Sequence, residues 1–302
     1  MTRRQFLHGT ALATAGVIAS RANPSARPRG ASPWRARMGL ELYTVRDLLA
    51  VDYEGTLAKV AALGYTEVEP TTYSDLPAKD VRAMLDRHGL SMPSTHAPAR
   101  GEGAELERAL EDFQVIGLTY TELPPDPVAP ASLEAFKRRA AALNARGRIT
   151  QRFGIKVFVH NHTSEFEPLA AMSRSGYDVL LDETDPALVA MQIDIGWASI
   201  AGVDPLALFR AHPGRFELWH VKDVFGLQTA SSSLSIEQRV RSTMVVPVGT
   251  GQVDWKAMFA QATRAGLKHF AIEQDNAATW GDSLAAARVS FQNLAAILDA
   301  AG

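Results

Sequence analysis

Metal-binding and acid–base side chains recur in this sequence at the points where short apolar runs end. Asp194, His220 and Glu273 each close such a run, and two further runs end at His96 and at His160. Carboxylates combined with imidazole form a site that suits a divalent cation such as Mn²⁺, Mg²⁺, Co²⁺ or Zn²⁺. The chain contains no cysteine, so nitrogen and oxygen must supply every metal ligand. These residues predict an enzyme with a divalent metal.

The apolar runs that carry these side chains alternate with stretches of helical periodicity. Glycine stands between an expected helix and an expected strand five times, at Gly64, Gly89, Gly117, Gly154 and Gly266. Because glycine readily adopts the left-handed conformation that ends a helix, the chain can turn back into the sheet there. Strands alternating with helices are typical of parallel βαβ units. We expect eight strands, at residues 38–43, 65–69, 90–95, 118–123, 155–160, 188–194, 216–221 and 269–273.

Eight strands in one continuous series favour a single closed (β/α)₈ barrel, a TIM barrel, over residues 37–302. Hydrophobic residues make up 46% of the chain, which is ample for such a core. The carboxyl ends of all the strands would meet at one mouth. Side chains alternate in direction along a strand, so Gln192 shares a face with Asp194, and Lys222 with His220. Residues 225–248 form a long polar insertion, which we expect to be a loop over the mouth.

Six ordered segments carry a resemblance to a known family. They are LYTVRD at 42–47, HNHTSEF at 160–166, QIDIGW at 192–197, HVKD at 220–223, GTGQVDW at 249–255 and IEQD at 272–275. Together they resemble the xylose-isomerase-like TIM-barrel family of sugar and sugar phosphate isomerases and epimerases.

The resemblance implies that one divalent metal is held by Asp194, His220, Glu273 and a residue after the fifth strand. Many relatives have glutamate at the tip of that strand, where this chain has His160. The His-Asn-His branch carries a glutamate shortly afterwards, here Glu165. We therefore expect Glu165 to be the fourth ligand, with His160 or His162 as its substitute.

Further polar and aromatic residues near the strand ends are candidate substrate contacts. Tyr43 and Trp197 are expected to line the pocket wall, because a sugar face stacks well on an aromatic ring; many relatives have a histidine in place of Trp197. Lys222 follows His220 on the same face and is a candidate to hold an oxyanion or to pair with Asp223. The remaining candidates for substrate binding are Glu69, His96, His160 and His162.

We interpret the chain as an isomerase or epimerase of a free sugar or keto-sugar. A divalent metal, Mn²⁺ by preference, would stabilise the enediolate that forms when a proton leaves carbon. Glu165 and Glu273 are the expected acid and base on opposite sides of the sugar. Two alternatives stay open: a lyase of the same fold that expels the aglycone of a 3-keto-glycoside, and a sugar-binding barrel without turnover.

Residues 1–30 are set apart from the barrel as a signal peptide and linker. Residues 2–7, TRRQFL, form a twin-arginine signature, and the apolar stretch at 10–20 is too short to span a bilayer. We therefore expect a periplasmic or secreted protein. Because no cysteine follows the apolar stretch, we expect no membrane anchor through a lipid.

Net charge argues against a nucleic-acid partner. The chain carries −2 overall, and residues 1–30 hold five arginines and no acidic residue, so the remainder carries −7. Nucleic-acid phosphates require a basic surface. The expected partner is a small-molecule sugar, and the resemblance allows a homo-oligomer through helical faces.

Overall fold

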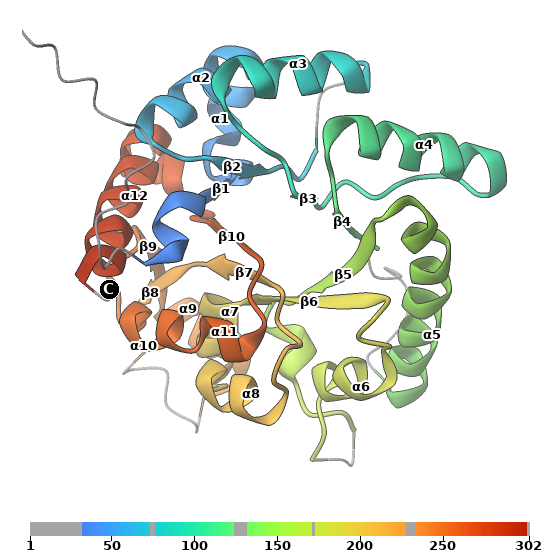
Figure 1. Cartoon of the computed structure of the whole chain (residues 1–302). Helices are drawn as coiled ribbons and strands as arrows, with labels where there is room; N and C mark the ends of the chain where they lie inside the picture. The colour runs from blue at the N-terminus through green and yellow to red at the C-terminus, as the bar shows by residue number, and fades with distance from the viewer. Residues whose placement is uncertain (1–31, 73–75, 124–131, 171–172, 228–233, 301–302) are drawn as a thin grey trace, which may run out of the picture.

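The computed structural model describes residues 32–72, 76–123, 132–170, 173–227 and 234–300, in which helices surround a barrel of parallel strands (Figure 1). The predicted signal peptide in residues 1–30 lies outside the described residues. The barrel strands are β1 (Gly39–Glu41), β2 (Glu67–Glu69), β3 (Ser94–Thr95), β4 (Tyr120–Glu122), β5 (Lys156–His160), β6 (Val189–Asp194), β7 (Leu218–Val221) and β10 (His269–Ile272).

The eight strands form one sheet in the order β2-β1-β10-β7-β6-β5-β4-β3, and every neighbouring pair is parallel. The two edges approach each other through a parallel bridge between Glu67 and Ser91, so the barrel is nearly closed. The predicted (β/α)₈ fold is confirmed. In this fold the carboxyl ends of the strands gather the candidate site residues at one mouth.

The helices are α1 (Arg46–Leu49), α2 (Tyr53–Leu63), α3 (Ala78–His88), α4 (Gly103–Ile116), α5 (Leu133–Thr150), α6 (Gly176–Glu183), α7 (Ile195–Ala201), α8 (Pro205–Ala211), α9 (Ile236–Ser242), α10 (Trp255–Ala260), α11 (Ala262–Ala265) and α12 (Ser283–Ala300). Short 3₁₀ helices are η1 (Pro33–Arg37), η2 (Leu42–Val45), η3 (Gln151–Phe153), η4 (Ser164–Phe166) and η5 (Ala277–Trp280). The five glycines that were predicted to end helices do so. Gly64 ends α2 at φ 105°, a left-handed conformation that side chains resist.

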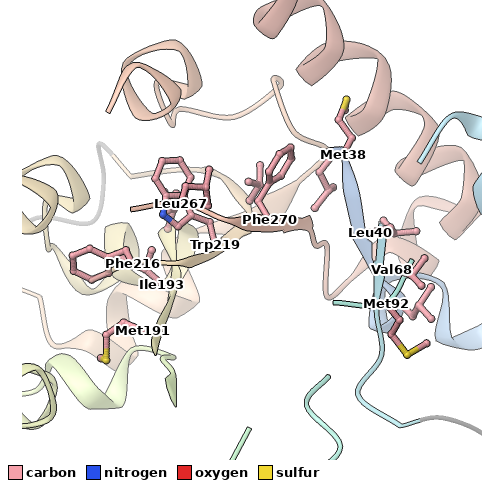
Figure 2. Close-up of a cluster of buried hydrophobic side chains, with 14 of the residues drawn as sticks. Met38, Leu40, Val68, Met92, Met191, Ile193, Phe216, Trp219, Leu267 and Phe270 are labelled. Carbon is pink, nitrogen blue, oxygen red and sulfur yellow. The ribbon is translucent and has the colours of Figure 1, made fainter. Parts of the chain in front are cut away.

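The main core lies between the strands and the surrounding helices. Figure 2 shows part of it, where Leu40, Val68, Trp219 and Phe270 come from four different strands. All four side chains are at most 2% exposed. Trp219 stacks on Phe209 of α8, with ring centroids 4.9 Å apart. Fully burying an aliphatic or phenyl side chain stabilises the fold by about 1.5–3 kcal/mol, so this layer fixes the strands that carry the site.

A smaller apolar cluster fills the barrel interior below the mouth. It consists of Tyr120, Phe158, Ala190 and Leu218, one residue from each of four neighbouring strands. Strand alternation places the residues two positions further along on the same interior face. That face therefore continues upward into Glu122, His160, Gln192 and His220.

The prediction that residues 225–248 form a loop was wrong. Residues at the two ends of this segment form an antiparallel pair, β8 (Asp223–Phe225) with β9 (Met244–Val246). Helix α9 lies between the two strands in the sequence. Val224 and Val246 are buried, and β-branched residues suit a half-buried strand pair. No helix within the described residues is long and apolar enough to cross a membrane.

Candidate active site and metal centre

Three of the four predicted metal ligands lie together at the carboxyl ends of β6, β7 and β10. His220 is in register with Asp194 on one side and with Ala271, two residues before Glu273, on the other. His220 Nδ1 lies 2.7 Å from Glu273 Oε2 and 3.8 Å from Asp194 Oδ2. One ligand atom from each residue lies within 4.8 Å of the other two. Residues far apart in the sequence thus form a single buried cluster.

The two carboxylate oxygens of Asp194 have different surroundings. Its Oδ1 accepts the backbone N–H of Trp197 at 2.7 Å and caps α7. Its Oδ2 is buried and meets the Lys222 ammonium at 3.0 Å without hydrogen-bonding geometry. Because a buried carboxylate oxygen without a hydrogen bond is costly, this atom suits coordination to a cation.

Lys222 places a buried positive charge beside the cluster. Its ammonium lies 3.0 Å from both Asp194 and Glu273, 2.8 Å from Asp275, and 4.8 Å from the ring centre of Trp197. Burial opposes the charge, but the three carboxylates raise the pKa of Lys222 above its usual value. Burial would likewise raise the pKa of Glu273, yet Lys222 and His220 hold it well below its usual range. Glu273 is therefore ionised.

His220 also contacts a second carboxylate on its other side. Its Nε2 lies 2.5 Å from Glu69 Oε1, so the ring stands between Glu69 and Glu273. Burial alone would lower the pKa of His220, but the two carboxylates raise it to about 10. In the metal-free protein this imidazole is charged. With a cation bound at Nδ1, it would donate its remaining N–H to Glu69, the arrangement that orients metal-ligating histidines.

Glu69 accepts hydrogen bonds from several side chains at the mouth. Besides His220, it accepts from Gln192 Nε2 at 2.9 Å, from His96 Nε2 at 3.1 Å and from the Ser94 hydroxyl. Burial raises its pKa, but His220 and the other donors lower it well below the usual range. Predicted as a substrate contact, Glu69 in the structure holds neighbouring side chains in place.

The predicted substrate contacts His96 and His160 point toward the same centre. His96 bridges Glu69 and Glu122, whose carboxylate lies 3.0 Å from Nδ1. Gln192 uses its amide nitrogen on Glu69, so its Oε1 faces His160 Nδ1 at 3.0 Å and accepts the ring N–H. This leaves His160 Nε2 as an acceptor. Burial and His220 lower the pKa of His160 well below its usual value, so the ring is neutral.

His160 lies closer to the cluster than Glu165 does. His96, His160 and His220 offer ligand nitrogens within 4.8 Å of one another, whereas Glu165 belongs to no such group among the described residues. Glu165 Oε2 accepts the His162 N–H at 2.9 Å and the Ser164 hydroxyl at 3.1 Å, while its Oε1 lies 3.9 Å from Arg139. Its carboxylate shapes the loop after β5 here, and its predicted catalytic and metal roles stay predictions.

A pocket of about 190 Å³ opens above these residues. Its lining comes from η2, the loops after β2 and β3, and the ends of β1, β5, β7 and β10: Glu41, Tyr43, Thr71, His96, His160, His162, His220, Glu273 and Asp275. The exposed His162 lies across from Trp197, with ring centroids 6.0 Å apart. Pockets for drug-sized ligands occupy about 300–1,000 Å³, so this one suits a smaller, polar molecule.

Sequence reasoning missed four acidic or amide side chains at the mouth: Glu41, Glu122, Gln192 as a hydrogen-bond partner, and Asp275. Glu41 is fully buried and lines the pocket. A charged residue inside the apolar run 38–43, two positions after Gly39 on the same face, was the available signal. Its surroundings come from other strands, which the sequence does not reveal.

The charge balance of the mouth fits a divalent cation. Six carboxyl groups surround it, and in the described part of the chain their cationic partners there are Lys222 and the imidazoles of His96 and His220. Buried negative charges require compensation. The oxygen and imidazole donors of Asp194, His220 and Glu273 match the preferences of Mn²⁺, Zn²⁺ and similar ions. The residues present therefore fit a metal.

The structure defines a (β/α)₈ barrel with a buried carboxylate–histidine cluster at its mouth, and sequence comparison identifies the family. The profile of the Xylose isomerase-like TIM barrel family matches residues 57–290. The chain belongs to this family.

Several curated relatives share one name. Inosose dehydratase of Clostridium tetani is 28% identical over 150 residues, which are 48% of this chain and 49% of the relative. Inosose dehydratase of Geobacillus thermodenitrificans is 27% identical over 255 residues, covering 75% of this chain and 84% of the relative. The chain spans about half the length of the first curated relatives it matches.

Solved structures share the fold. A sugar phosphate isomerase/epimerase from Parabacteroides distasonis has a TM-score of 0.72 at 22% identity, covering 93% of this chain and 98% of its own. The IOLI protein with a bound zinc atom has a TM-score of 0.64 at 13% identity, covering 88% and 99%. At these identities the likeness concerns the fold alone.

Proposed function

We propose that this protein is a divalent-metal-dependent enzyme that moves a proton next to the carbonyl group of a sugar or keto-sugar, as an isomerase or epimerase. The observation that carries the proposal is the buried cluster of Asp194, His220 and Glu273 at the mouth of the barrel. The family supports an enzyme that processes small sugars. Manganese is the metal that we expect.

Asp194, His220 and Glu273 would hold the metal, and His160 presents a neutral nitrogen beside them. When bound, a divalent metal stabilises negative charge on oxygen atoms of the substrate. Glu273 is ionised and lines the pocket, so it is placed to accept a proton from the substrate carbon. His220 and Lys222 fix the position of this carboxylate.

The walls of the pocket favour a polar, ring-shaped ligand. Tyr43 is 36% exposed at the rim, and the Arg46 guanidinium lies 3.9 Å from its ring centre. Arg46 also donates to the backbone oxygens of Tyr43 and Asp275, so it ties the rim after β1 to the rim after β10. We expect Tyr43 and Trp197 to contact the faces of a sugar, and His162 to contact its hydroxyl groups.

The twin-arginine signature supports a proposal about location and substrate. Residues 1–30 would direct export to the periplasm, where unphosphorylated sugars are the expected substrates. A reporter fused to residues 1–35 tests this: export should stop when Arg3 and Arg4 are replaced by lysine. Export that persists in the variant would refute twin-arginine targeting and leave the enzymatic proposal untouched.

A lyase is the second candidate, and the names of the curated relatives favour it. Elimination and isomerisation both begin when a base removes a proton next to a carbonyl group. They differ in the second step, because elimination also requires a proton for the departing oxygen. The site would then act on a keto-sugar or keto-polyol with a β-oxygen substituent.

Solvent exchange tests the shared first step. Purified protein loaded with Mn²⁺ is incubated in D₂O with a panel of ketoses, inosose and 3-keto-glucosides, and deuterium incorporation is followed by NMR. We expect exchange next to the carbonyl group with at least one compound. Glu273→Gln should abolish it while the protein stays folded by circular dichroism. Unchanged exchange in that variant would refute the role of Glu273 as base.

A further inference from the structure

A second group of possible metal ligands lies on the β1–β3 side of the mouth. One ligand atom from each member lies within 4.8 Å of the others, and the members are Glu41, Glu69, His96 and His220. Glu41 at the end of β1 is in register with Glu69 at the end of β2, and both side chains are at most 3% exposed. Glu273 follows β10, the neighbour of β1 on its other side, so the three carboxyl groups form one wall.

Glu41 brings an unsatisfied carboxylate oxygen to this group. Its Oε1 receives the backbone N–H of Tyr43 at 3.3 Å, and its buried Oε2 has no hydrogen-bond partner among the described residues. The residue lines the pocket together with His96 and His220. Because a buried carboxylate oxygen without a partner is costly, coordination to a cation would stabilise it.

The ammonium group at the mouth does not reach Glu41 or Glu69. Lys222 contacts three other carboxylates, and in the described part of the chain no lysine or arginine forms an ion pair with either glutamate. The imidazoles of His96 and His220 are the ion-pair partners of Glu69, and Glu41 has none there. Buried carboxylates require compensation, which a divalent cation between these two would supply.

His96 is oriented as a metal ligand. Its Nδ1 lies 3.0 Å from Glu122 Oε2, and its Nε2 lies 3.1 Å from Glu69 Oε1. Donor atoms bound to one cation at about 2.0–2.2 Å are about 2.8–3.6 Å apart, so the spacing between Nε2 and Glu69 fits a shared cation. With a cation at Nε2, the Nδ1–H group would donate to Glu122, which is the arrangement that orients metal-ligating histidines.

His220 stands between the two groups of ligands. Its Nδ1 lies 2.7 Å from Glu273 and 3.8 Å from Asp194, while its Nε2 lies 2.5 Å from Glu69 Oε1, a hydrogen-bond distance. His220 can therefore ligate the first metal through Nδ1 and still donate its other N–H to Glu69. The two sites are linked by this hydrogen bond and need not share a ligand atom.

We infer that Glu41, Glu69 and His96 bind a second divalent cation, beside the metal centre already described. Two carboxylates and one imidazole suit Mn²⁺ or Zn²⁺. Glu41 and His96 line the pocket, so this cation would face the space that the substrate occupies. The inference goes beyond the proposed function, because the number of bound cations is measured without substrate.

Counting bound Mn²⁺ tests the inference. The full-length protein is freed of metal with a chelator and titrated with Mn²⁺, and the free ion is followed by its EPR signal. We expect the wild type to bind two equivalents. Glu41→Gln, which keeps the size of the side chain, should weaken one equivalent by more than the about 10–100-fold typical of an outer-shell partner. Asp194→Asn should weaken the other equivalent, and the double variant should lose both.

Two nearby carboxylates provide graded controls. Glu122→Gln should weaken the second site by about 10–100-fold, because Glu122 would orient His96 without binding the ion. Glu165→Gln should leave both equivalents unchanged, because Glu165 belongs to no ligand group in the described part of the chain. If Glu41→Gln does not fold by circular dichroism, His96→Asn takes its place: asparagine retains an N–H for Glu122 and lacks Nε2.

The second site and the proposed function fail in distinguishable ways. A wild type that binds one equivalent at saturating Mn²⁺ would overturn the second site. So would two equivalents that keep their affinity in the folded Glu41→Gln or His96→Asn variant, or a double variant that still binds one, because the ion would then lie elsewhere. Wild-type protein that exchanges no carbon-bound proton in D₂O with any compound of the panel would refute the proposed function, whatever number of cations it binds.

Discussion

Replacing Lys222 with methionine tests the claim that the Lys222 ammonium compensates the buried carboxylates at the mouth. The Lys222 side chain is 1% exposed, and its ammonium lies within 3.0 Å of Asp194, Glu273 and Asp275. Methionine has a similar length and no charge. In the metal-free protein the substitution leaves these carboxylates without their ammonium partner, while Glu273 keeps its contact with His220.

The expected cost follows from the burial of the pair. Removing one partner of a buried ion pair costs about 3–5 kcal/mol, because the remaining charge stays buried and uncompensated. At roughly 2 °C per kcal/mol for a domain of this size, metal-free Lys222→Met should melt about 6–10 °C below the wild type. A bound divalent cation supplies positive charge to the same carboxylates. We therefore expect saturating Mn²⁺ to reduce the difference in unfolding free energy to less than half.

Urea unfolding followed by circular dichroism, with chelator and with Mn²⁺, measures both differences. Lys137→Met is the matched control, because Lys137 is 52% exposed and lies 3.9 Å from Glu183. A surface pair of this kind contributes about 0–1 kcal/mol, with no dependence on metal. If both variants lose the same stability without metal, Lys222 is not compensating buried carboxylates. A difference that Mn²⁺ leaves unchanged would place the cation away from Asp194 and Glu273.

Three further predictions concern the ligands. Asp194→Asn should weaken Mn²⁺ binding by more than the about 10–100-fold typical of an outer-shell partner, measured by calorimetry; unchanged affinity would exclude Asp194 as a ligand. Glu165→Gln should keep its metal, measured by elemental analysis, and lose about 1–2 kcal/mol of stability through its loop hydrogen bonds; loss of metal would instead support the sequence prediction. Metal-free protein should lose stability as pH rises from about 6.5 through 10 in urea titrations, because the pKa of His220 is about 10 when folded and lower when unfolded; stability that rises over this interval would contradict the charged His220.

The fold was predictable because its signals are local. Gly64, Gly117 and Gly266 end their helices at φ values of 105°, 98° and 89°, as the helix–glycine–strand pattern requires. Strand positions followed from apolar runs, although the hydrogen-bonded strands are shorter than the runs. Residues 90–95 contain only a two-residue strand, β3. Hydrophobicity indicates burial, and burial continues beyond the residues that make ladder hydrogen bonds.

The site was only partly predictable, because its organisation depends on pairs of residues from different strands. Asp194, His220 and Glu273 stood at strand ends, and strand alternation aimed them at one mouth. The placement of Glu165 came from the family pattern, and nothing local indicated its bond to its own loop. Glu41 had no signal beyond a charge in an apolar run. Its lack of partners becomes visible only when β1, β2 and β10 are side by side.

Hydrogen-bond and ion-pair partners are distributed unequally over the neighbouring carboxyl groups at the mouth. Glu273 must be ionised both to bind a cation and to accept a proton, and Lys222 and His220 keep it so. Glu41 receives only the backbone N–H of Tyr43 among the described residues, because the nearby side-chain donors are bound to Glu69 and Glu273. Neighbouring carboxyl groups on one wall therefore differ in how many donors hold them, and Glu273 is the one that Lys222 and His220 keep ionised.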